Sequence, residues 1–238
     1  MSYIAIVPLA GRGNRLKPIT DKLPKALVDV GGKPIAQRCV EQLLNAGINE
    51  FVFVIGYLGE QIEKHFREIL PSGTTTHFYK QEVLDGTGGV LKLLKKDFDN
   101  RNFLMVFGDS FFADSAIGDL LTDQSKNSFA AVRVHDPERY GVVSLNENGF
   151  VEAIEEKPKN PTSNLVVGGM YKFDKSVWNY VDKLELSPRG EYELPDIIKL
   201  LLEDGELIRP VTISHMYDVG TVKELRRLNT LIQKGDLF

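Results

Sequence analysis

The chain has 238 residues, of which 42% are hydrophobic and 26% are charged, which is the composition of a soluble globular protein. A formal net charge of −4 argues against a protein that binds nucleic-acid polymers, because such proteins need a concentrated positive surface. The single cysteine, Cys39, excludes a disulfide within the chain. The sequence shows no signal-peptide pattern and no apolar run near the roughly 18 residues of a membrane span, so we expect a cytoplasmic protein with no membrane partner.

Strand-like and helix-like segments alternate through the first half of the chain, as they do where parallel strands are joined by helices. We therefore predict an α/β fold with a Rossmann-like, mixed but mostly parallel central sheet flanked by helices. Strands are expected at 4–7, 51–55 and 103–107, and helices at 34–46 and 58–70.

The second half of the chain changes character. The segments 142–145 and 150–154 flank an Asn-Glu-Asn-Gly turn, which predicts a β-hairpin. A strand is expected at 166–173, and helices at 174–184, 194–203 and 221–233. No internal repeat or low-complexity linker interrupts the chain, so we expect a single domain over 1–238.

The most informative segment follows the first predicted strand. Gly11–Arg15 reads Gly-Arg-Gly-Asn-Arg, and Pro24-Lys25 comes nine residues later. A glycine-rich turn after a strand exposes backbone N–H groups that bind phosphate, and Arg15 and Lys25 add two cations of different geometry. The segment predicts a polyphosphate site. An oxidoreductase is disfavoured, because its dinucleotide-binding fingerprint needs a third glycine where Leu16 stands.

The run from Ala10 to Ile35 resembles the signature of the sugar-1-phosphate nucleotidylyltransferases (NDP-sugar pyrophosphorylases), roughly G-x-G-T-R, a variable stretch, then P-K. The resemblance extends over nearly the whole chain. Asn14 stands where the family usually has Thr or Ser, and Ala10 where it often has Gly. The resemblance implies transfer of a nucleotidyl group from a nucleoside triphosphate to a sugar 1-phosphate, with a nucleotide-binding half near 1–125 and a sugar-phosphate-binding half near 126–238.

Two aspartates are candidate ligands for Mg²⁺, the cofactor that the resemblance implies. Asp109 follows a predicted strand, at the edge where open α/β sheets bind ligands, and the matching aspartate of the family holds the metal. Asp218 lies in a segment that resembles the family's late D-x-G-T pattern. We expect the two to converge in space, the alternatives being a turn or helix-cap role for Asp109 and a helix-starting turn for Asp218.

The segment from Gln81 to Gly89 resembles the part of these enzymes that reads the base. A carboxamide offers donors and an acceptor together, so Gln81 can pair with uracil or thymine. A glycine-rich surface loop is the alternative. The residues expected to bind the nucleotide are Leu9, Ala10, Gly11, Gly13, Asn14, Gln81, Gly86 and Thr87, and those expected to act in catalysis are Arg15, Lys25 and Asp109.

Three later segments resemble the sugar-phosphate side of the family. Lys157 is expected to neutralise the phosphate, and Glu156 and Asn164 to bind sugar hydroxyls, whereas a Glu-Glu-Lys-Pro run on its own is ordinarily solvated charge. The residues expected on this side are Tyr140, Gly141, Glu156, Lys157, Asn164, Gly169 and Arg189.

We expect an enzyme that uses UTP or dTTP and glucose 1-phosphate, since Gln81 and the segment 189–193 most resemble the glucose-1-phosphate thymidylyl- and uridylyltransferases. Two alternatives stay open at this point: a non-catalytic regulatory homologue that binds nucleotide or sugar, and the same chemistry with GTP or CTP and another phosphorylated acceptor. The expected partners are these small molecules, with no nucleic-acid polymer and no membrane, and association with copies of the same chain is left open.

Overall fold

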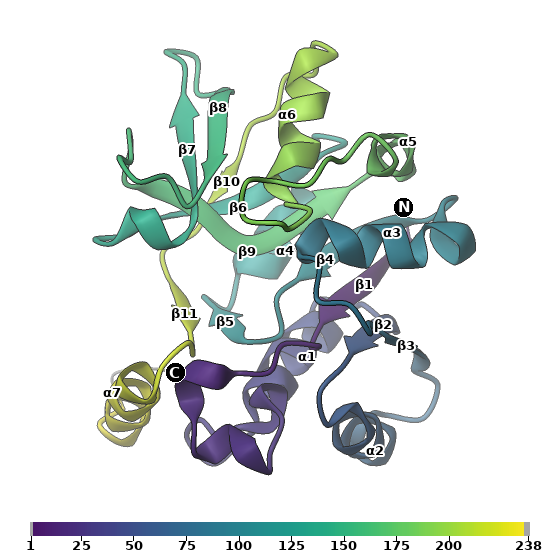
Figure 1. Ribbon diagram of the computed structural model, residues 1–238, viewed down its shortest axis with the longest axis vertical. Helices are drawn as coiled ribbons and strands as arrows, with labels where there is room; N and C mark the ends of the chain where they lie inside the picture. The colour runs from purple at the N-terminus through teal and green to yellow at the C-terminus, as the bar shows by residue number, and fades with distance from the viewer. Residues whose placement is uncertain (1, 236–238) are drawn as a thin grey trace. The chain divides into compact units, whose positions relative to one another are not determined.

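The computed structural model describes residues 2–235 (Figure 1). These residues form two compact units. Unit 1 comprises residues 2–3, 83–105 and 115–215, and unit 2 comprises residues 4–82, 106–114 and 216–235. The two units are defined by packing alone. The expected nucleotide-binding role of 1–125 and sugar-phosphate-binding role of 126–238 stay predictions.

The first part of unit 2 is a parallel ladder of three strands with β2 in the middle. The strands are β1 (Tyr3–Pro8), β2 (Glu50–Ile55) and β3 (Thr75–Lys80), with Ala5 opposite Phe51 and Glu50 opposite Thr75. Residues 4–7 and 51–54 are fully buried apolar runs, as expected of parallel strands covered on both faces. The strands predicted at 4–7 and 51–55 are confirmed.

Helices α1 (Ile35–Asn45) and α2 (Gly59–Ile69) follow β1 and β2 in the chain, close to their predicted positions. In α1, Ile35, Cys39 and Leu43 recur every four residues and are fully buried, so one face of the helix belongs to the core. Burial, with a smaller contribution from Asp109, raises the pKa of the Cys39 thiol, so this cysteine is a core residue rather than a nucleophile.

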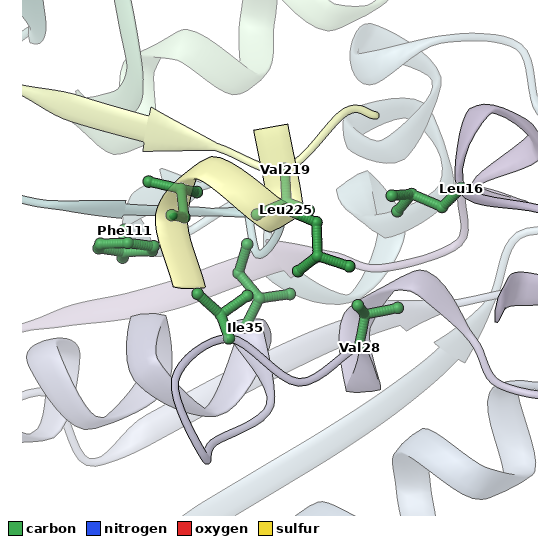
Figure 2. Close-up of a cluster of buried hydrophobic side chains, with 8 residues drawn as sticks. Leu16, Val28, Ile35, Phe111, Val219 and Leu225 are labelled. Atoms are coloured by element: carbon green, nitrogen blue, oxygen red, sulfur yellow. The ribbon is translucent and has the colours of Figure 1, made fainter. Parts of the chain in front are cut away.

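The second part of unit 2 joins distant parts of the chain. Strand β5 (Ser110–Phe112) pairs antiparallel with β11 (Met216–Asp218), and α7 (Val222–Gln233) follows. Figure 2 shows the side chains of the core beneath them converging from these segments and from the loop after β1. The members of this core cluster are Leu16, Val28, Val30, Ile35, Phe111, Val219, Leu225 and Leu228.

Unit 1 contains the predicted hairpin, formed by β7 (Gly141–Leu145) and β8 (Val151–Glu156), which run side by side in Figure 1. Its long, fully buried strand β9 (Leu165–Phe173) pairs antiparallel with β6 (Ser128–Arg133) and meets β7 at Val142. The remaining strands are β4 (Asn102–Val106), most of which belongs to this unit, and β10 (Val211–Thr212), which runs parallel to β6.

The helices of unit 1 are α3 (Thr87–Phe98), α4 (Ala116–Thr122), α5 (Trp178–Val181) and α6 (Pro195–Glu203). α6 packs against β8, and α3 packs against α5. The helix expected at 174–184 is shorter than predicted: Asp174 caps a 3-10 turn by accepting the Ser176 N–H, and only one turn of α-helix follows. The 3-10 helices of the described chain are Asn14–Leu16, Ile19–Asp21, Lys25–Leu27, Pro137–Arg139 and Lys175–Val177.

Within residues 2–235, none of the helices combines the length and the apolar character that a membrane crossing requires.

Candidate active site

The loop after β1 carries the predicted phosphate contacts. Leu9 and Ala10 are buried, and the Leu9 N–H donates to the carbonyl of Val54 (2.7 Å), so these two residues anchor the start of the loop. Gly11 and Asn14 are exposed. The turn is therefore open to solvent at Gly11 and at the short polar side chain of Asn14, which is compatible with the predicted polyphosphate site.

Gly13 fixes the shape of this loop and the place of Lys25. Its φ of 64° lies in the left-handed region that favours glycine. A Cβ at this position would also lie 3.0 Å from both the Lys25 Cβ and the Thr20 Cγ2. The Thr20 hydroxyl donates to the Gly13 carbonyl (2.8 Å). Any larger residue at 13 would therefore displace the lysine predicted to act on phosphate.

Lys25 and Asp109 form an ion pair, with Nζ 2.5 Å from Oδ2. The Lys25 side chain is only 16% exposed, whereas that of Asp109 is 41% exposed. The largest single influence on the pKa of Asp109 is desolvation, which opposes ionisation of the carboxyl. The charge and hydrogen bond of Lys25, helped by the Ser110 hydroxyl and the Asp109 backbone, outweigh it and hold the pKa of Asp109 below its usual range. Asp109 is therefore a carboxylate at neutral pH.

The two predicted metal ligands lie on neighbouring backbone positions. Asp218 pairs with Ser110 in the β11–β5 ladder, and the Val219 N–H donates to the Asp109 carbonyl (3.1 Å). Asp218 is the last residue of β11, and Thr221, three residues later, caps α7 with its hydroxyl accepting the Glu224 N–H. The metal role of Asp218 stays a prediction. Asp109 does lie in a turn, which the Ser110 N–H closes onto Phe107.

These carboxylates fit the chemistry of a magnesium ion. Carboxylate oxygens are hard ligands, and Mg²⁺ usually takes one or two of them together with phosphate and water. Within residues 2–235, no group of three or more His, Cys, Asp and Glu side chains is placed to hold a metal. A magnesium ion here would thus depend on Asp109, Asp218 and the oxygens of its substrate.

A side chain on another element fixes β5. The Gln42 amide of α1 donates to the Phe112 carbonyl (2.8 Å), and the Phe112 N–H donates back to the Gln42 Oε1 (3.2 Å). Gly108, the residue before Asp109, has a packing reason to be glycine, because a Cβ there would collide with the Leu9 side chain. Both contacts stabilise the segment that carries Asp109.

The segment predicted to read the base divides into two parts. In unit 2, the Gln81 N–H continues the sheet ladder by donating to Ile55 (2.9 Å). In unit 1, Gly86 has a φ of 97°, and a Cβ there would collide with the Tyr192 carbonyl. Thr87 begins α3, and its hydroxyl accepts the Leu194 N–H (3.1 Å). Gly86 and Thr87 are thus packed against 192–194 rather than part of a loose surface loop.

In unit 1 the hairpin brings together four of the residues expected to bind the sugar phosphate. Gly141 pairs with Glu156 across β7 and β8, and a Cβ at Gly141 would lie 3.2 Å from the Glu156 Oε2. The Lys157 N–H donates to the Tyr140 carbonyl (2.9 Å), and its Nζ lies 2.8 Å from the Glu156 Oε1. Lys157 has a φ of 46°, a strained conformation that places its side chain beside Glu156.

Arg189 joins this cluster from a distant part of the sequence. Its Nη1 lies 3.5 Å from the Glu156 Oε1 and 3.2 Å from the Glu193 Oε1, and its Nη2 lies 3.2 Å from Glu191. The Ser187 hydroxyl also donates to Glu193 (3.0 Å). A single arginine is therefore shared among three carboxylates.

Glu193 is the residue that sequence reasoning missed here. Its side chain is only 6% exposed, and burial raises the pKa of its carboxyl. Ser187 and Arg189 lower that pKa, but Glu156 and Glu191 add to the increase. The sequence did contain a signal for this ion pair: Glu193 lies four residues after Arg189 in the segment Arg-Gly-Glu-Tyr-Glu.

Two residues expected on the sugar side have separate structural roles. The Asn164 amide oxygen accepts a hydrogen bond from the Arg133 Nη1 (2.6 Å), and its carbonyl accepts one from the Val134 N–H. Gly169 has a φ of 72° within β9, which faces the irregularity in the β6–β9 register between Phe129 and Ala131. Their contact with a sugar stays a prediction.

Comparisons with known proteins find relatives that match most of this chain. The chain is 34% identical to the bifunctional protein GlmU of Methanocaldococcus jannaschii over 94% of its length and 53% of that relative. It is 33% identical to the UTP–glucose-1-phosphate uridylyltransferase AglF of Haloferax volcanii over 88% of its length and 87% of that relative. The chain spans about half the length of the GlmU relatives it matches.

A solved structure matches with a TM-score of 0.84 and 28% identity, covering 97% of this chain and 95% of the other. It is a Bacillus anthracis protein assigned as a glucose-1-phosphate thymidylyltransferase and crystallised with sucrose. The likeness confirms the predicted α/β class, with a mixed, mostly parallel sheet flanked by helices. A model of the nucleotidyl transferase family matches residues 4–235, and the chain therefore belongs to that family, as the resemblance of the run from Ala10 to Ile35 predicted.

Proposed function

We propose that this protein transfers a nucleotidyl group from UTP or dTTP to glucose 1-phosphate, giving the NDP-sugar and pyrophosphate. The observation that carries the proposal is the Lys25–Asp109 ion pair in unit 2, with Asp218 opposite Ser110 on the neighbouring strand. The activities named for the Haloferax and Bacillus proteins support this choice of substrates.

The chemistry needs charge stabilisation more than proton transfer. An oxygen of the sugar phosphate attacks the α-phosphorus, the bond between the α-phosphorus and the bridging oxygen breaks, and pyrophosphate leaves with that electron pair. The attacking oxygen is already anionic at pH 7, so no general base is required. The obstacle is repulsion between anions, which positioned cations reduce.

In unit 2, we assign the triphosphate to the N–H groups of Gly11 and Gly13 and to the side chains of Arg15 and Lys25. Asp109 holds Lys25 in place in the substrate-free protein. When bound at Asp109 and Asp218, magnesium would neutralise charge on the phosphate oxygens. We assign reading of the base to Gln81, whose amide can match the donor and acceptor of uracil or thymine.

In unit 1, we assign the sugar phosphate to Lys157 and Arg189, and the sugar hydroxyls to Glu156. Glu156 already contacts both cations through one oxygen, Oε1, while Oε2 lies over Gly141. The carboxylate can therefore keep its cations in place with one oxygen and accept a sugar hydroxyl with the other.

Pyrophosphate release from five nucleotides (UTP, dTTP, GTP, CTP and ATP), each with several sugar 1-phosphates and magnesium, tests the proposal. We expect the highest rate for UTP or dTTP with glucose 1-phosphate. Binding of nucleotide without release in any combination would instead identify a non-catalytic homologue. Release with GTP or CTP alone would retain the chemistry and overturn the assignment of the base.

A further inference from the structure

Arg15 is exposed, yet its guanidinium has a defined place against Gly220. A Cβ at Gly220 would lie 3.1 Å from the Arg15 Nη2 and 3.4 Å from its Cζ. Real Cβ atoms seldom have neighbours this close, so a methyl group at position 220 would push the guanidinium aside by a few tenths of an ångström. The φ of Gly220 is outside the left-handed region, so the backbone itself would accept another residue.

A shared hydrophobic cluster explains why Arg15 and Gly220 lie close together. Leu16, next to Arg15, and Val219, next to Gly220, are both fully buried in the same cluster. This cluster also contains Leu225 of α7 (Figure 2). The loop after β1 and the turn after β11 are thus packed into one core. This packing brings Arg15 and Gly220, which neighbour Leu16 and Val219 in the chain, close together.

A carboxylate shares this place. The Gly220 N–H donates to the Glu224 Oε2 (2.9 Å), and that oxygen is also 3.1 Å from the position of a Gly220 Cβ. Glu224 lies in the first turn of α7, where the positive end of the helix dipole favours a negative charge. Gly220 is therefore bordered by one cation and one anion, and it lies two residues after Asp218.

We propose that Gly220 is a positioning residue that seats the Arg15 guanidinium for binding the polyphosphate. The proposal rests on the proposed function in assigning phosphate to Arg15, and it adds the residue that sets where that arginine lies. A guanidinium binds phosphate through a fork of fixed geometry, so a small displacement loses more than it would for a lysine. Asp218 is the last residue of β11, directly before this turn, so the positions of the Arg15 guanidinium and the Asp218 carboxylate depend on the same segment.

A double-mutant cycle with Gly220→Ala and Arg15→Ala tests the proposal, with calorimetric binding of inorganic tripolyphosphate as the readout. We expect Gly220→Ala to weaken binding about tenfold, the effect of losing one good charge-assisted contact. In the Arg15→Ala background the same substitution should change binding less than about twofold, because its effect passes through the arginine. Gly118→Ala is the matched control, since no atom lies within 4 Å of a Cβ at that position.

Three outcomes would overturn the proposal. The first is unchanged binding in Gly220→Ala. The second is an equal loss in the wild-type and Arg15→Ala backgrounds, which would show that the substitution acts on the fold. The third is a loss that persists in Arg15→Ala and disappears in Glu224→Ala, which would show that the methyl group displaces Glu224.

A nuclear magnetic resonance measurement on the substrate-free protein separates this proposal from the proposed function. We expect the Arg15 Nε–H signal to shift or broaden in Gly220→Ala and to stay unchanged in Gly118→Ala. An Arg15 signal that is identical in Gly220→Ala and wild type contradicts the proposal, whatever the activity. A wild-type protein that releases no pyrophosphate contradicts the proposed function instead, and the Arg15 signal still decides where the guanidinium is held.

Discussion

Asp109 in unit 2 and Glu193 in unit 1 each contact a cation, yet their pKa values move in opposite directions. Burial raises the pKa of both carboxyls. Lys25 and nearby hydrogen bonds outweigh that influence at Asp109, whereas at Glu193 the carboxylates of Glu156 and Glu191 reinforce it. The direction of each pKa shift is therefore decided by whether the neighbouring charges oppose the effect of burial or add to it.

The contrast suggests different tasks for the two clusters. The Lys25–Asp109 pair holds one cation and one anion at fixed positions, as binding of metal and phosphate requires. The cluster around Arg189 carries more carboxylates than cations and so offers acceptors for the hydroxyls of a sugar. Substitutions in the two clusters should thus affect different steps.

Asp109→Asn should have the largest effect. We expect turnover to fall by at least about 10²-fold, because the change removes a metal ligand and the anion that holds Lys25. Steady-state pyrophosphate release and thermal unfolding together check this. Asp114→Asn, which alters an exposed aspartate of the same unit, is the control. A folded Asp109→Asn protein with more than a tenth of wild-type activity would show that the metal assignment is wrong.

Lys25→Ala should reduce turnover by about 10²–10³-fold, the usual cost of removing one group that stabilises developing charge. The measurement is kcat and KM for the nucleotide. A rise in KM alone would make Lys25 a binding residue rather than one that stabilises the transition state. An unchanged kcat and KM would reduce it to a structural partner of Asp109.

Gln81→Glu should change which base is used more than how fast the best nucleotide reacts. The carboxylate lacks the amide donor for the O4 carbonyl of uracil and thymine, so UTP and dTTP should lose efficiency sharply. CTP, whose exocyclic amine is a donor, should gain relative to them. Ratios of kcat/KM for the three nucleotides measure the change, and unaltered ratios would mean that the base is read elsewhere.

Glu193→Gln should have the smallest effect, one that depends on pH. The folded-state pKa of Glu193 is raised, so its contribution to stability is fully present below the unfolded pKa of about 4.3 and is lost as the pH rises through the folded pKa. Gln stays neutral at every pH, so the stability of the variant relative to wild type should increase from pH 4 to pH 7.

Chemical denaturation at several pH values measures this difference. Glu191→Gln, which removes a carboxylate from the exposed side of the same arginine, controls for the change in net charge. A relative stability of Glu193→Gln that falls as the pH rises would contradict the inferred direction of the pKa shift.

Much of the fold could be predicted from the sequence, because long apolar runs and helical stripes report burial directly. The strands at 51–55 and 166–173 and the helix at 221–233 were predicted to within one or two residues. By contrast, β5 and β11 have only three residues each, too few to show a period. Their pairing joins positions about a hundred residues apart, and no local pattern encodes it.

The candidate site divides in the same way. Motifs supplied Lys25, Asp109 and Asp218, and the structure pairs Lys25 with Asp109 and sets Asp218 opposite Ser110, the residue after Asp109. Gln42 could not be assigned a role, because its effect arises from the strand that it contacts in the folded chain, whereas the spacing of Glu193 from Arg189 was a usable signal that was missed. Sequence patterns therefore supplied the candidates for ligand binding, whereas the contacts that hold those candidates in position are seen only in the folded chain.

Phosphorus nuclear magnetic resonance of one reaction tests the central claim most directly. Wild-type protein is mixed with UTP, glucose 1-phosphate and magnesium, and the same mixture is followed with Asp109→Asn and after chelation of the metal. We predict that the signals of UDP-glucose and pyrophosphate grow together with the wild type and stay at the background level in the other two samples. Equal product formation with and without magnesium and Asp109 would contradict the account.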